Sequence, residues 1–200
     1  MIKIGIFGLI GSGKTEVSRM FAEKGAIVIS ADEIGKEVVD SNPDVLEALK
    51  QKFGTDIIDD KGQLKRRDLG RRVFASESER KKLDAIVHPP LLESLSKAIS
   101  DAENRGTIDI LVVDAALILN WGIGSWFDYL ICVTAPEKRQ LERLQSAGFS
   151  EEEAMDRINS QIPKQRQIEA ADFIIENDGS IDDLREKVSI LYKDIISLKK

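Results

Sequence analysis

Residues 8–15 read Gly8-Leu9-Ile10-Gly11-Ser12-Gly13-Lys14-Thr15. This stretch matches the phosphate-binding pattern G-x-x-x-x-G-K-[ST] at every fixed position. Glycines let a backbone turn its N–H groups inward around phosphate oxygens, and the helix that follows presents its positive end to the same anion. We therefore expect all eight residues to bind ATP, with Lys14 bridging the β- and γ-phosphates and the Thr15 hydroxyl holding Mg²⁺.

The segments around this loop favour an α/β fold. The apolar run Ile2–Phe7 precedes the loop, and Lys14–Lys24 has helical spacing after it. Further apolar runs that predict strands lie at Ala26–Ser30, Ile110–Val113, Tyr129–Val133 and Phe173–Ile175. Helical patterns follow at Glu137–Gln145, Glu151–Ser160 and Ile181–Leu198. This alternation predicts a P-loop NTPase fold, with a central parallel five-stranded sheet flanked by helices.

Two stretches interrupt the alternation. The chain has 200 residues, which suits one domain over 1–200. The core is expected at about 1–31, 107–137 and 171–200. Residues 32–106 carry helical patterns and few strand signals, and by analogy with other P-loop kinases they predict a helical acceptor-binding region. Residues 138–170 are polar and rich in arginine and lysine, which favours a lid over bound phosphates.

Composition narrows the function classes. The formal net charge of −6 and the pI of about 5.0 argue against a nucleic-acid binder, which usually carries a basic patch. No apolar run is long enough to span a membrane, and the first residues do not resemble a signal peptide. Cys132 is the single cysteine, so no internal disulfide forms and a reducing cytoplasm is expected. The sequence leaves the oligomeric state open.

Two aspartates follow expected strands. Asp114 ends the apolar run 110–113, where a Walker-B carboxylate would give Mg²⁺ a second anchor. An ordinary aspartate that caps a turn fits the same pattern. Asp32 follows the second strand, where a carboxylate can accept a proton from an acceptor hydroxyl. A helix N-cap before Glu33–Val39 explains Asp32 equally well.

Two residues of the helical region are candidates for binding an anionic acceptor. His88 is the only histidine and precedes Pro89-Pro90, which are expected to end the helix before them. It is either a structural residue or a contact to a ligand phosphate or ribose. Arg66 is either solvated surface or a contact to the acceptor.

The whole chain, from Ile4 to about Leu191, resembles the bacterial dephospho-CoA kinase family. The matching blocks besides the phosphate loop are 30–34, 62–66, 83–89, 114–117, 140–144, 157–161 and 171–177. The resemblance implies ATP-dependent phosphorylation of the ribose 3′-hydroxyl of dephospho-CoA, the last step of coenzyme A biosynthesis, with ATP and Mg²⁺ required.

The resemblance also implies roles for single residues. Asp32 acts as the catalytic base, Arg143 covers the transferring phosphoryl group from the lid, and Asn177 belongs to the ATP site. Metal ligands are Thr15 and Asp114. Residues expected to contact the acceptor are Asp32, Arg66, His88 and Asp114.

The chain departs from the family pattern after Asp114. Ala116, Leu119 and Asn120 stand where the family carries proline, phenylalanine and glutamate, and the segment 145–147 lacks the arginine usual there. These changes bear on acceptor affinity and lid closure more than on reaction type. Two alternatives therefore stay open: another small-molecule or nucleoside monophosphate kinase, and a nucleotide-dependent switch without catalysis.

Overall fold

The computed structural model describes residues 1–106 and 108–198, apart from the side chain of Phe74. Two compact units divide the chain: Met1–Ser30 with Asp101–Lys200, and Ala31–Ser100. The boundaries expected at residues 107 and 200 lie outside the described residues.

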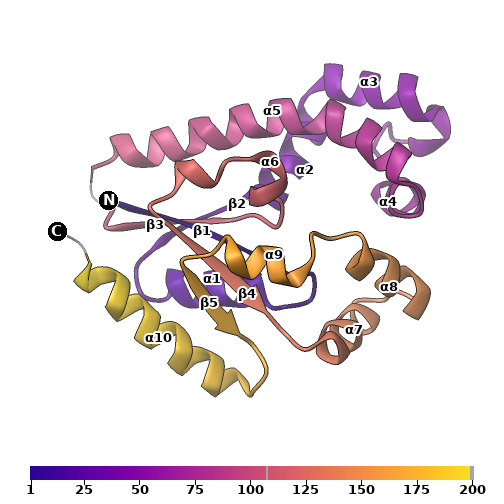
Figure 1. Cartoon of the computed structure of the whole chain (residues 1–200). Helices are drawn as coiled ribbons and strands as arrows, with labels where there is room; N and C mark the ends of the chain where they lie inside the picture. The colour runs from indigo at the N-terminus through magenta and orange to yellow at the C-terminus, as the bar shows by residue number, and fades with distance from the viewer. Residues whose placement is uncertain (107, 199–200) are drawn as a thin grey trace. The chain divides into compact units, whose positions relative to one another are not determined.

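The first unit is built on a parallel five-stranded sheet in the order β2-β3-β1-β4-β5 (Figure 1). Its strands are Ile2–Gly8 (β1), Ile27–Ser30 (β2), Ile110–Asp114 (β3), Tyr129–Thr134 (β4) and Phe173–Glu176 (β5). In the centre, Ile4 of β1 pairs with Val112 on one side and with Tyr129 on the other. The predicted strands are confirmed, each to within one residue at its ends, because continuous apolar runs mark strands buried on both faces.

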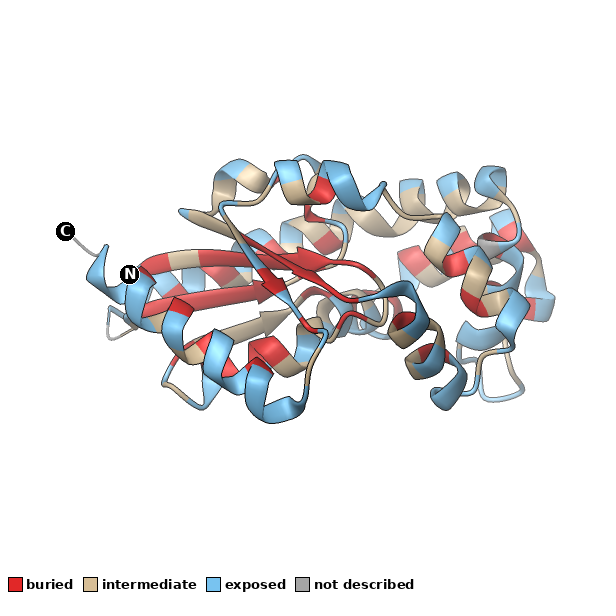
Figure 2. Ribbon diagram, turned by 60° about the horizontal axis from the view of Figure 1, so that its bottom comes forward, coloured by how far each residue is buried: buried red, intermediate tan, exposed pale blue. Residues whose placement is uncertain are grey.

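Helices cover this sheet. Lys14–Ala22 (α1) and Ile181–Ser197 (α10) lie together on one side of it (Figure 1). α10 begins at a Ser180–Asp183 capping box and buries Leu184, Val188 and Ile195 along one stripe. The buried residues concentrate on the strands and on the helix faces toward them (Figure 2). Further segments of this unit are Ile118–Trp121 (α6), Gly124–Trp126 (η2), Glu137–Ser146 (α7), Glu151–Asn159 (α8) and Lys164–Glu169 (α9).

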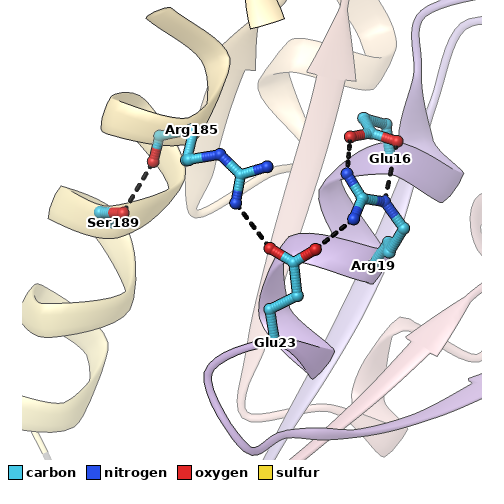
Figure 3. Close-up of polar contacts among 5 residues, drawn as sticks. All are labelled: Glu16, Arg19, Glu23, Arg185 and Ser189. Atoms are coloured by element: carbon cyan, nitrogen blue, oxygen red, sulfur yellow. Dashed lines mark hydrogen bonds and ion pairs between the residues drawn. The ribbon is translucent and has the colours of Figure 1, made fainter. Parts of the chain in front are cut away.

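A chain of ion pairs joins the solvent-facing sides of α1 and α10. Arg19 donates to Glu16 and to Glu23 on its own helix, and Arg185 of α10 reaches the other carboxylate oxygen of Glu23 at 2.6 Å (Figure 3). The bonds to Arg19 lower the pKa of Glu16. The last helix is thus tied to the helix that follows the phosphate loop.

The second unit is helical. Its elements are Ala31–Ser41 (α2), Pro43–Phe53 (α3), Thr55–Ile57 (η1), Arg66–Phe74 (α4) and most of Glu77–Asn104 (α5). Asn42 caps α3, accepting from the amides of Asp44 and Val45, and proline occupies the first helical position. A separate apolar core, which includes Leu49 and Leu69, holds the unit together.

One helix runs longer than expected. Pro89 and Pro90 were predicted to end the helix before them, but α5 continues through both, so that prediction is wrong. The two prolines lack the N–H donors that would bond the carbonyls of Ala85 and Ile86, and their rings crowd those carbonyls. Residues after the prolines, including Leu91 and Leu95, are buried, and their packing keeps this part of the chain helical.

Candidate active site

The phosphate loop connects β1 to α1, as expected. Gly13 takes a left-handed conformation with φ 96° at the start of α1. A Cβ on Gly8 would lie 2.1 Å from the carbonyl oxygen of Val133, and one on Gly13 would lie 2.5 Å from the Asn177 side-chain nitrogen. The contact at Gly8 is with backbone and requires glycine, whereas at Gly13 the close atom ends a side chain and the left-handed φ is the firmer reason for glycine.

Lys14 folds back across this loop. Its Nζ donates to the carbonyl oxygens of Gly8 at 3.1 Å and of Leu9 at 3.0 Å. Thr15, the next residue, is exposed. The ammonium group predicted to bind phosphate is thus held at the loop by main-chain oxygens.

Arg143 reaches the same loop from α7. Its Nη1 donates to the carbonyl oxygen of Gly11 at 2.8 Å. Burial and, after it, the nearby Arg139 cation lower the pKa of the Arg143 guanidinium, although arginine stays protonated in proteins. One helical turn earlier, Arg139 donates to the carbonyl oxygen of Gly179 at 2.9 Å. A positive charge therefore stands beside the loop.

Asn177 lies directly after β5 and is buried. Its Nδ2 donates to the carbonyl oxygen of Ser12 at 2.8 Å, and its own amide donates to Thr134 at 2.8 Å. Because the Asn177 side chain bonds a main-chain oxygen of the loop, it helps to fix the backbone shape of the loop.

Asp114 ends β3 at the carboxyl edge of the sheet. It pairs in register with Ile6 of β1 and with Ser30 of β2, and it is half-buried. Ligands bind at this edge in open parallel sheets. The structure thus places Lys14, Arg143 and Asn177 around one loop, and Asp114 on the strand beside β1.

The other predicted residues, Asp32, Arg66 and His88, belong to the second unit and lie on three different helices. Asp32 is exposed and is the second residue of α2. The alternative that Asp32 caps a helix starting at Glu33 is wrong, because the helix begins directly at Ala31.

Arg66 and His88 have partners within their own unit. Arg66 donates from Nη2 to the carbonyl oxygen of Lys36 at 3.0 Å and to Asp40 at 2.7 Å, which ties α4 to α2. The Nε2 atom of His88 lies 3.2 Å from Asp84, one turn earlier on α5. An anionic acceptor would compete with Asp40 for Arg66.

Sequence reasoning missed one contact to the loop. The backbone amide of Ile10 donates to the Oε1 atom of Gln161 at 2.8 Å, across 151 residues of sequence. A single glutamine in a polar segment does not by itself predict a contact to the loop. Gln161 stood out only because it belongs to the block 157–161, which matches the family.

Comparisons with known proteins identify the family and the fold of this chain. The model of the dephospho-CoA kinase family matches residues 2–183. A dephospho-CoA kinase of Thermobifida fusca is 36% identical over 196 residues, which cover 98% of this chain and 96% of the relative. A crystal structure from Thermus thermophilus matches at TM-score 0.77 and 28% identity, over 96% of this chain and 97% of that one.

A second solved structure, dephospho-CoA kinase from Campylobacter jejuni, shares the fold. It matches at TM-score 0.71 and 24% identity, over 96% of both chains. Within the described residues, no helix has the length and apolar character needed to cross a membrane. The predicted P-loop fold and the predicted family are both confirmed, and the chain belongs to the dephospho-CoA kinase family.

Proposed function

We propose that this protein transfers the γ-phosphoryl group of ATP to the ribose 3′-hydroxyl of dephospho-CoA, giving coenzyme A and ADP. The main support is a family match over residues 2–183, joined to a complete phosphate loop between β1 and α1. ATP is the phosphoryl donor that a kinase of this family uses. We place the reaction in the cytoplasm, which suits a buried free thiol such as Cys132.

The nucleotide is proposed to bind over residues 8–15. The helix start at Lys14 favours the anionic phosphates. In the structure, Lys14 is bonded to two loop carbonyls, so reaching the β- and γ-phosphates exchanges one main-chain oxygen for phosphate oxygens. That exchange places the ammonium charge where negative charge builds up during transfer.

Mg²⁺ is proposed to bind at Thr15 and Asp114. An exposed hydroxyl and a half-buried carboxylate at the sheet edge are oxygen ligands of the kind that Mg²⁺ takes. Among the described residues there is no group of three or more potential metal-binding His, Cys, Asp or Glu side chains. That fits an ion held by one or two protein ligands together with ATP phosphates. The ion would neutralise phosphate charge.

Residues 138–170 are proposed to form a lid, with Arg143 facing the transferring group. The guanidinium already lies against the loop, 2.8 Å from the Gly11 carbonyl oxygen. A charge-assisted bond to a phosphate oxygen is stronger than one to a neutral carbonyl. Bound nucleotide should therefore draw Arg143 from Gly11 to the phosphates.

The acceptor is proposed to bind through the helical unit, residues 31–100. Asp32 would orient the ribose hydroxyl and take its proton. Arg66 and His88 would contact the acceptor, with Arg66 exchanging Asp40 for an acceptor phosphate. Phosphoryl transfer passes through a loose transition state with little bonding to the incoming oxygen. Most of the rate gain from Asp32 would therefore come from placing the hydroxyl in line with the phosphoryl group.

An acceptor panel tests this function. Purified protein with Mg-ATP would be given dephospho-CoA, nucleoside monophosphates, shikimate or no acceptor, and ADP release would be followed. Mass spectrometry would show whether the acceptor gains one phosphoryl group. We expect ADP formation to depend on dephospho-CoA. Preference for another acceptor would select the alternative kinase, and indifference to every acceptor would select the switch.

A further inference from the structure

The bond between Ile10 and Gln161 joins the phosphate loop to the predicted lid. Gln161 lies in the connection between α8 and α9, and its Oε1 accepts the Ile10 amide at 2.8 Å. A P-loop holds phosphate with amides that point inward. The Ile10 amide is instead directed to a side chain of another segment.

The connection that carries Gln161 is itself held on both sides. Before it, the Ser160 hydroxyl donates to the Arg157 carbonyl at 2.9 Å, and the buried Arg157 side chain stacks 4.2 Å from the Phe149 ring. After it, the buried Gln167 donates from Nε2 to the Ile162 carbonyl at 2.8 Å. Gln161 is therefore presented by an anchored turn.

The chemical consequence follows from the planarity of the peptide bond. The Ile10 N–H and the Leu9 carbonyl belong to the same peptide unit and point in opposite directions. Gln161 holds the N–H side of this unit, and Lys14 donates to its carbonyl side at 3.0 Å. The Ser12 amide donates to the same carbonyl at 3.1 Å, so Gln161 on one side and Ser12 with Lys14 on the other hold this rigid plane together.

We propose that Gln161 is a positioning residue for Lys14. By orienting the Leu9–Ile10 peptide, Gln161 aims the carbonyl that holds the Lys14 ammonium at the loop. An ammonium has three N–H donors, so Lys14 can keep this bond while its other donors reach the phosphates. Without Gln161, this peptide is held only on its carbonyl side, by Ser12 and Lys14, so its orientation is less firmly fixed and Lys14 samples more directions. Misplacing a catalytic group by about 1 Å can cost ~10²-fold in rate, so we expect Gln161→Ala to lower kcat by about ten- to a hundredfold. This inference rests on the proposed role of Lys14 in phosphoryl transfer.

The test compares three variants. Gln161→Ala removes the acceptor oxygen, whereas Gln161→Glu keeps an oxygen in the same place. Gln165→Ala is the matched control, because Gln165 is exposed and bonds Glu169 within α9. We expect kcat to fall in Gln161→Ala and to stay near wild type in the other two. In Gln161→Glu the added negative charge raises the KM for ATP instead. A kcat of Gln161→Ala within twofold of wild type would overturn the proposal.

A double-mutant cycle separates positioning from general loosening of the fold. In a Lys14→Ala background, measured by single-turnover rates, Gln161→Ala should have no further effect because its partner is gone. An equal loss in both backgrounds would overturn the proposal.

Amide exchange gives a readout that needs no acceptor. In the ligand-free protein, Gln161→Ala should speed exchange of the Ile10 amide, whereas Gln161→Glu and Gln165→Ala should not. Unchanged exchange of Ile10 would overturn the proposal whatever the substrate proves to be. An inactive wild-type protein in the acceptor panel would instead contradict the proposed function.

Discussion

Lys14 is bonded to two carbonyl oxygens of its own loop, those of Gly8 and Leu9. We predict that Lys14→Ala lowers turnover by at least ~10²-fold, because a preorganised charge is lost where the transition state needs it. Steady-state rates at saturating ATP measure this, with the exposed Lys193→Ala as the control. A variant within tenfold of wild type would show that Lys14 is not the charge used.

Asp32 is the second residue of α2, inside its first turn. We predict that Asp32→Asn keeps ATP-analogue affinity and loses about 10²-fold in turnover, toward the low end of the range for a general base. Asp44 is the second residue of α3, so Asp44→Asn is a control at the same helical position. Melting temperature, analogue affinity and turnover should be measured together. Normal turnover in a well-folded Asp32→Asn protein would remove Asp32 from the mechanism.

Cys132 is fully buried in β4, and burial raises the pKa of its thiol to about 11 from an ordinary 9.0. A raised folded-state pKa gives stability that is fully present below pH 9 and is lost as pH rises through 11. We predict that this thiol accounts for about 2–3 kcal/mol of the loss in unfolding free energy over that window. Urea titrations at pH 8 and pH 11 should show a smaller drop in Cys132→Ala. Equal drops would contradict the prediction.

Among the elements, we expect the lid, residues 138–170, to change its amide hydrogen exchange when ligands bind. Two positions of residues 138–170, Arg143 and Gln161, contact adjacent loop residues in the structure. We predict that an ATP analogue with acceptor increases amide protection across this segment, because phosphate pairing with its arginines orders it. Hydrogen exchange with and without ligands checks this, and α10 serves as the internal reference. Unchanged protection across 138–170 would contradict a lid.

The elements also show how far the sequence can be read. Strands such as β3 were predictable because a short, unbroken apolar run favours a buried strand. The course of α5 through Pro89 was not, since local proline rules weigh against it while packing of Leu95 and its neighbours decides it. In the site, the glycines and Lys14 follow from a motif. The contact of Gln161 depends on a fold that brings distant segments together, and pattern alone cannot give that.

On the scale of the whole molecule, removal of metal should affect turnover and folding differently. The Mg²⁺ proposed at Thr15 and Asp114 is held largely through ATP phosphates, so the ion is needed for transfer and not for the fold. We predict that EDTA leaves the melting temperature of the ligand-free protein unchanged and abolishes turnover, with activity restored by excess Mg²⁺. A lower melting temperature in EDTA would reveal a structural metal instead.

The central place of β1 in the sheet has a consequence for synthesis on the ribosome. β1 is the first strand made, yet both of its neighbours, β3 and β4, come much later. At ~5–20 residues per second, Ile110 emerges roughly 5–20 s after its partner Ile2. During that interval the nascent chain carries an apolar strand with two unpaired edges, the kind of segment that associates with other chains. The yield of folded enzyme therefore depends on what shields Ile2–Gly8 while translation continues.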